Sequence, residues 1–130
     1  MKQLTLNQQL ALMPVSIPET VLDFLEDFNF PNAMHTDVAK ESLDTEFWRK
    51  SSADIVKQLE AFRAAKGKVI SVEISAGGRE LSGAFLCKLT CELGACGVGL
   101  MTRMKEKQIY KIILEAESYS EDSLRNKLKE

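Results

Sequence analysis

The segment CKLTCELGAC, residues 87–96, contains all three cysteines of the 130-residue chain. Thiols at this spacing could serve as metal ligands, as a nucleophilic or redox site, or as packing residues of a core. No other segment has side chains of comparable reactivity. The role of these cysteines therefore decides whether this part of the chain carries chemistry.

A metal site is the first alternative, and the spacing argues against it. Structural zinc takes four ligands, usually from tight turns that wrap the ion. Cys87 and Cys91 instead fall on a predicted strand, about 13 Å apart at a rise of about 3.3 Å per residue. His35 is the only histidine, and nothing in the sequence places it near the thiols. We therefore predict no metal and no cofactor, and we interpret the cysteines as core thiols.

A nucleophilic cysteine needs a lowered pKa and usually a base beside it. Leu89 and Leu93 alternate with Cys87 and Cys91 on the same predicted strand face, which favours an apolar surrounding. Burial there raises the expected pKa values of the thiols and leaves them inert. Slow labelling of the native protein by thiol reagents is the corresponding expectation.

Proton-transfer chemistry would need a carboxyl group inside an apolar pocket. The acids of the predicted strands all fall on the polar phase, opposite the apolar residues. The nearest acids that could reach a cavity are Asp23 and Asp27 beside the apolar stripe of the first helix, and we interpret both as surface residues. No catalytic residue is assigned. The sequence favours a non-catalytic protein, with a small enzyme of isomerase or dehydratase type acting on an apolar molecule as the alternative.

Composition narrows the class of protein further. Hydrophobic residues make up 45% and charged residues 28% of the chain, as in a soluble globular domain. A net charge of −2 supplies no positive field for a phosphate backbone, so we expect no nucleic-acid partner. No run approaches the roughly 18 apolar residues of a membrane span. An odd number of cysteines without an export signal predicts a reducing, cytoplasmic location.

Three helices are predicted in the first half of the chain. Ser16, Thr36 and Ser51 each have the residue type and setting of an N-cap before an apolar stripe. Trp48 is expected to end the second helix, and Gly67 suits the C-terminal end of the third. The predicted helices therefore cover about residues 16–29, 36–48 and 51–66.

The second half changes to the two-residue period of strands. Segment 68–75, for example, alternates Ile70, Val72 and Ile74 with polar residues. Strands are predicted over about 68–75, 81–93, 96–104 and 108–117, with glycines 83, 97 and 99 at bends or bulges. Together these elements predict an α+β fold in which three N-terminal helices pack on a curved, four-stranded antiparallel sheet. Residues 1–15 are interpreted as an arm, 16–117 as a single domain and 118–130 as a polar helical tail anchored by Leu124 and Leu128.

The order of elements resembles the nuclear transport factor 2-like superfamily, which has the cystatin-like cone fold of ketosteroid isomerase. The resemblance spans roughly residues 18–117 and rests on EFW at 46–48, AAKGKVISVEI at 64–74 and QIYKIILEAE at 108–117. Two departures are the missing hairpin after the second helix and Ile109-Tyr110 where relatives often have tryptophan. The resemblance implies a cone-shaped fold, a pocket between the first helix and the sheet, and a homodimer formed through the sheet. It carries over no reaction, because members of one fold differ in function.

The fold and the burial pattern together define two candidate surfaces. A small apolar ligand could occupy the implied pocket, although the same side chains could simply fill the core. Residues predicted to line the pocket are Phe24, Phe28, Trp48, Phe62, Leu89, Leu100 and Tyr110. Residues predicted to form an interface on the outer sheet face, with a second copy or another protein, are Leu86, Thr90, Met101, Arg103 and Ile113. A binding or protein-interaction module is the function that this pattern favours.

Overall fold

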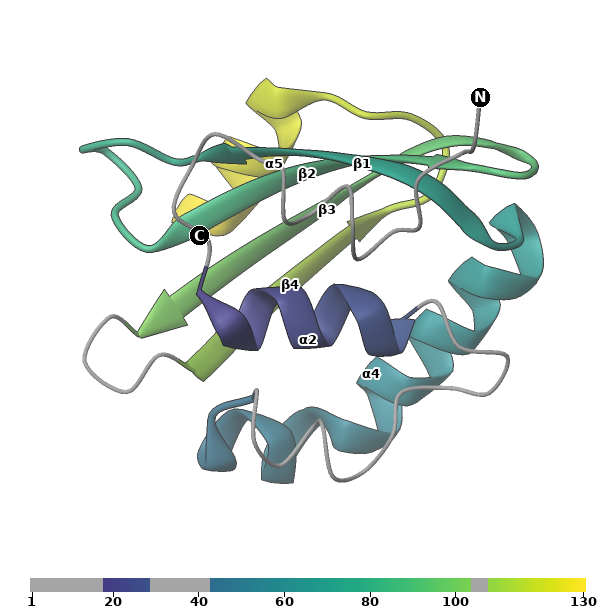
Figure 1. The fold of residues 1–130 in the computed structure, drawn as a ribbon. Helices are drawn as coiled ribbons and strands as arrows, with labels where there is room; N and C mark the ends of the chain where they lie inside the picture. The colour runs from purple at the N-terminus through teal and green to yellow at the C-terminus, as the bar shows by residue number, and fades with distance from the viewer. Residues whose placement is uncertain (1–17, 29–42, 104–107) are drawn as a thin grey trace.

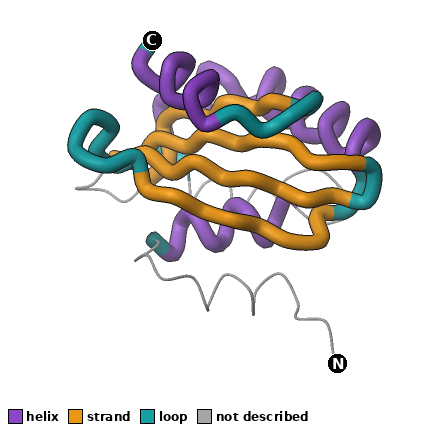
Figure 2. Tube along the Cα trace, turned by 90° about the horizontal axis from the view of Figure 1, so that it is seen from above, coloured by secondary structure: helices purple, strands orange, loops and turns teal. Residues whose placement is uncertain are grey.

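A computed structural model describes residues 18–28, 43–103 and 108–130 of the chain. Its described elements are α2 (Glu19–Phe28), α4 (Thr45–Lys66), β1 (Val69–Ala76), β2 (Ala84–Cys91), β3 (Gly94–Arg103), β4 (Gln108–Glu115) and α5 (Glu121–Lys129). The four strands lie side by side as one antiparallel sheet in the order β1-β2-β3-β4 (Figure 2). The predicted α+β class and the four-stranded antiparallel sheet are therefore confirmed.

Helix α4 corrects the predicted break between the second and third helices at residues 48–51, while residues 36–42 of the second helix lie outside the described residues. Thr45–Lys66 is one helix of 22 residues, and its N-cap is Asp44. Leu43 forms a parallel bridge with Ile109 of β4 and so lies outside any helix. Ser51 starts no new helix, because an apolar stripe runs through α4 from Trp48 to Ile55 and onward. The predicted caps Ser16 and Thr36 lie outside the described residues.

The main core lies between one face of the sheet and the helices α2 and α4 (Figure 1). Phe24 and Leu25 of α2 are buried against it, as are Leu59 and Phe62 of α4. The sheet contributes a continuous layer from all four strands. Its fully buried members include Cys87, Leu89, Cys96, Val98, Leu100 and Ile109. None of the described helices, α4 included, has the length and apolar character to cross a membrane.

Helix α5 covers part of the opposite face of the sheet. Its two predicted anchors, Leu124 and Leu128, are 0% and 4% exposed and pack with Leu86 of β2. Met101 and Ile113, which were expected to face solvent or a partner, pack against the same cluster. The outer face is therefore not the open surface that the alternation of apolar and polar residues predicted.

Glycines in β3 make the approach of α5 possible. A Cβ on Gly97 would lie 3.2 Å from Cδ1 of Leu124, and one on Gly99 would lie 3.1 Å from Cδ1 of Leu128. Both separations are tighter than ordinary van der Waals contact between carbons. The two glycines were predicted to mark bends or bulges, but their place in the structure is beneath α5, where an added Cβ would force the ends of the Leu124 and Leu128 side chains to shift.

Two β-bulges change which residues face the core. The β1–β2 register shifts between Val69 and Ser71, so Val69 is buried and Ile70 is 39% exposed. In β4, Thr102 pairs with Ile109 while Met101 pairs with Lys111, which leaves Tyr110 as the extra residue. The predicted inward positions of Ile70 and Tyr110 are therefore wrong, because an extra residue reverses the phase of alternation.

Candidate functional site

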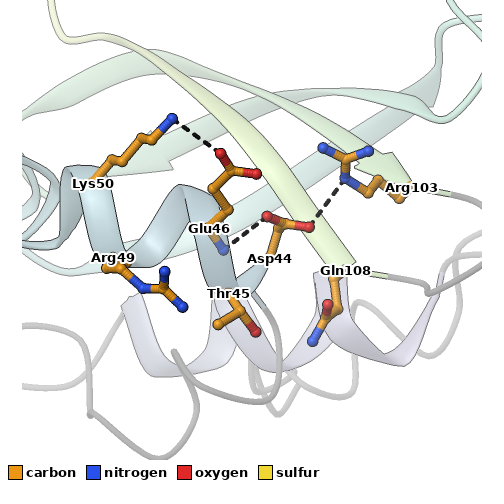
Figure 3. Close-up of a pocket in the computed structure, with 7 residues that line it drawn as sticks. All are labelled: Asp44, Thr45, Glu46, Arg49, Lys50, Arg103 and Gln108. Atoms are coloured by element: carbon orange, nitrogen blue, oxygen red, sulfur yellow. Dashed lines mark hydrogen bonds and ion pairs between the residues drawn. The ribbon is translucent and has the colours of Figure 1, made fainter.

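A polar hollow of about 610 Å³ lies at the start of α4, where the helix meets the ends of β3 and β4. Figure 3 shows the side chains that surround it. The lining residues are Asp44, Thr45, Glu46, Arg49, Lys50, Arg103 and Gln108. Its volume falls in the range of small-molecule sites, about 300–1,000 Å³, but its charged lining differs from the mainly apolar walls of such sites.

Asp44 organises this hollow through both its backbone and its side chain. Its amide donates to the carbonyl of Ile109 at 2.7 Å, which ties the start of α4 to the edge of β4. Its Oδ1 accepts hydrogen bonds from the amides of Glu46 and Phe47, both at 3.1 Å. These two bonds satisfy amide groups that a helix N-terminus otherwise leaves without partners. Asp44 is therefore held in place as a structural carboxylate.

Arg103 reaches the same carboxylate from β3. Its Nε lies 3.0 Å from Oδ2 of Asp44, and its guanidinium carbon lies 4.9 Å from the ring centre of Tyr110. The aromatic ring and the carboxylate together fix the guanidinium group. The bulge at Tyr110 thus brings a predicted pocket residue and a predicted interface residue together, in a place that neither prediction anticipated.

The remaining charges of the hollow come from successive turns of α4. Glu46 and Lys50 form an exposed ion pair of 3.0 Å, and the hydrogen bond from Lys50 lowers the pKa of Glu46. A lowered pKa keeps this carboxylate ionised, so it is poorly suited to donate a proton near neutral pH. No carboxylate of the described residues lies in ion-pair range of Arg49. Within the described part of the chain, Arg49 is thus a cation of the hollow without a carboxylate partner.

A second, smaller hollow of about 190 Å³ lies between α4 and β4. Phe47 and Ile55 of α4, with Ile112 and Leu114 of β4, supply its apolar residues. Its remaining lining residues are Ser51, Asp54 and Gln58. Its volume is below the usual range of small-molecule sites. The apolar part of this lining suits one apolar side chain of a larger partner.

The predicted apolar pocket is occupied by packed side chains. Phe24, Leu89 and Leu100 are all 0% exposed and belong to one core cluster, together with Phe62. Trp48 packs against that cluster from its side. The side chain of Phe28, like those of Asp23 and Asp27, lies outside the described residues. The described pocket residues other than Tyr110 therefore serve as core.

The predicted interface residues fall into separate environments. Leu86 is fully buried within the chain, and Met101 and Ile113 pack with the anchors of α5. Arg103 is engaged with Asp44, while Thr90 is exposed. The structure does not gather these five residues on one accessible surface. Sequence periodicity placed most of them on the correct face but could not show that α5 covers it.

The cysteines are free and buried, as predicted. Burial raises the pKa of Cys87 to about 12. The Sγ atoms of Cys91 and Cys96 lie 3.6 Å apart, a pairing that the sequence reading missed. The turn after Cys91, marked by Gly94, was the signal that could have predicted it. Among the described residues, no group of three or more cysteine, histidine or acidic side chains could hold a metal ion.

Comparison of this chain with protein-family models, with curated proteins and with solved structures gives no match.

Proposed function

We propose that this chain is a non-catalytic protein-interaction module that binds a polypeptide segment at the boundary between α4 and β4. The observation that carries the proposal is the presence of two hollows along this boundary, one lined mainly by charged residues and one by both apolar and polar residues. Arg49 offers a cation in the first, and Ile112 with Leu114 offers an apolar surface in the second. A partner segment with an acidic residue and an apolar residue would match both.

Two features of the boundary favour a polypeptide over a small apolar ligand. The lining of the larger hollow is mainly charged, and the smaller hollow, with its mixed lining, has only about 190 Å³. The residues predicted to line an apolar pocket, such as Phe24 and Leu100, are buried in the core. A cone fold of the nuclear transport factor 2-like superfamily remains part of the proposal, supported by the α+β class and the single antiparallel sheet. No described residue favours the isomerase or dehydratase alternative.

A selection from a displayed peptide library against the immobilised chain, followed by affinity measurements, tests this function. We expect Arg49→Glu, which reverses a charge, and Ser51→Trp, which fills the smaller hollow, each to weaken the selected peptide about tenfold or more, a change of about 1.4 kcal/mol. Lys57→Glu is the matched control, since this exposed residue of α4 lines neither hollow. Selection of no peptide, or equal weakening by the control, would reject the proposal.

The proposal includes a homodimer, but the dimer surface is smaller than the whole outer face of the sheet, because α5 covers part of that face. Lys111 of β4 is not free to contact a second copy, since it donates to the carbonyl groups of Leu128 and Glu130 at the end of α5. The part of the outer face that remains exposed includes Glu73, Lys88 and Thr90 on β1 and β2. We propose self-association through this strip. Light scattering at tens of micromolar protein checks it, and a monomer there would count against it.

A further inference from the structure

We propose that Cys91 and Cys96 form a dithiol site that exchanges with small-molecule disulfides and closes to an intramolecular disulfide. Cys91 ends β2 and pairs with Gly94, while Cys96 on β3 pairs with Leu89, so the two cysteines lie diagonally across one hairpin. Their Sγ atoms are 3.6 Å apart. A disulfide has a sulfur separation of about 2.05 Å, so closure needs the two sulfurs to approach by about 1.5 Å.

The two thiols differ in access, which assigns their roles. Cys91 is 5% exposed and precedes the turn, whereas Cys96 is 0% exposed. Leu93, the second of the two turn residues that follow Cys91, is 68% exposed. Amide hydrogen bonds from Glu92 to Lys68 and from Leu93 to Lys66 hold the turn against the end of α4. Local opening of this turn exposes Cys91 first, so Cys91 is the attacking thiol and Cys96 the resolving one.

The surroundings also favour a thiolate on Cys91. The hydrogen bond with Cys96 lowers the pKa of Cys91, and the positive charge of Lys66 lowers it further, while burial and the charge of Glu92 oppose this shift in part. The same hydrogen bond and burial raise the pKa of Cys96. The ammonium group of Lys66 lies close to the turn, since a Cβ on Gly94 would be 3.5 Å from its Nζ. Cys87 has no such partner among the described residues and sits deep in the core. The chain thus contains a reactive pair and an inert internal control.

The exchange balances in two steps. The Cys91 thiolate attacks one sulfur of a small-molecule disulfide, that S–S bond breaks, and the departing thiolate takes a proton from water. The Cys96 thiol then loses its proton to water, and its sulfur attacks the Cys91 sulfur of the mixed disulfide. A second small thiol leaves in this step. In total the two protein thiols lose two electrons and two protons, and the small-molecule disulfide gains them.

Peptide mapping of the full, freshly reduced chain in glutathione mixtures tests the site. After acid quenching, alkylation and trypsin digestion, Cys91 and Cys96 share the peptide 89–103, and Cys87 lies in the peptide 80–88. We expect peptide 89–103 to appear with the mass of its disulfide form, two hydrogens lighter than the dithiol and without alkyl groups, while Cys87 stays fully alkylated. The site would be overturned if the native chain kept both thiols reduced in mixtures that oxidise the same chain in urea. It would also be overturned if Cys87 reacted at the same rate.

Cysteine and lysine variants separate the attack of Cys91 from the closure by Cys96. Cys96→Ser is expected to stop at a glutathione adduct on Cys91, and Cys91→Ser is expected to leave Cys96 unmodified. Lys66→Met should slow the reaction several-fold at neutral pH, whereas Lys68→Met, a matched change beside it, should not. An adduct that forms on Cys96 faster than on Cys91, or equal rates in the two lysine variants, would contradict the assigned roles.

Discussion

Asp44 and Arg103 join the start of α4 to the end of β3, with 3.0 Å between Oδ2 and Nε. The same carboxylate caps the helix through Oδ1. Asp44→Ala removes the cap and the ion pair, and we expect it to lower the free energy of unfolding by about 1–2 kcal/mol. Asp44→Asn keeps a capping oxygen and should lower the free energy of unfolding by less than Asp44→Ala does. Urea unfolding of both variants measures the difference, and an alanine variant as stable as the asparagine one would refute the capping role.

Leu124 and Leu93 offer the same substitution in opposite environments. Leu124 is fully buried between α5 and the sheet, whereas Leu93 is 68% exposed in the β2–β3 turn. We expect Leu124→Ala to lower the free energy of unfolding by about 2–5 kcal/mol. Leu93→Ala should change it by no more than about 0.5 kcal/mol. Chemical denaturation measures both, and similar losses for the two variants would mean that α5 does not pack on the sheet.

Gly99 and Leu128 should be energetically coupled. An added methyl group at Gly99 would meet Cδ1 of Leu128 at 3.1 Å, and we expect Gly99→Ala to destabilise the chain by about 1–3 kcal/mol. Leu128→Ala removes Cδ1, the atom that the added methyl group would meet. The double variant should therefore be more stable than the sum of the two single losses, by about 0.5 kcal/mol or more. Strict additivity in unfolding experiments would show that the glycine does not make room for α5.

Stability is expected to fall at alkaline pH because of the buried thiol of Cys87. Cys87 keeps its proton in the folded chain up to a pKa of about 12, against 9.0 for a free thiol. Between these two pH values the thiol loses its proton in the unfolded state but keeps it in the folded state. The stabilisation that protonated Cys87 gives to the folded chain is therefore complete below about pH 9 and is lost as the pH rises toward 12. The slope is at most about 1.4 kcal/mol per pH unit for one thiol. Urea unfolding as a function of pH should give a shallower slope for Cys87→Ala, and an unchanged slope would contradict the assignment.

Alternation of apolar and polar residues was sufficient to predict the sheet but not its irregularities. The buried face of β2, with Phe85, Cys87 and Leu89, follows the two-residue period without interruption. At Ile70 and Tyr110 a bulge inserts one residue and reverses the phase. A bulge changes pairing and not composition, so neither segment shows it in its sequence.

The helices and the site were harder to predict for a different reason. Asp44 caps α4 because Leu43 and Ile109 bridge at the edge of β4, a contact between residues far apart in the chain. A capping motif at Ser51 is equally good locally but has no such support. The hollow beside Asp44 likewise depends on tertiary contacts, because its lining residues come from the start of α4, from β3 and from β4. Local patterns therefore located the core residues and missed the charged site.

Chemical-shift mapping of the isotope-labelled chain with a library-selected peptide tests peptide binding at the α4–β4 boundary most directly. We expect the backbone amides of Phe47, Arg49, Ile112 and Leu114 to shift, because these residues line the two hollows. Amides of the exposed strip at Glu73 and Thr90 should stay in place. Shifts confined to that strip or to the turn at Leu93, with none along α4 and β4, would contradict binding at this boundary.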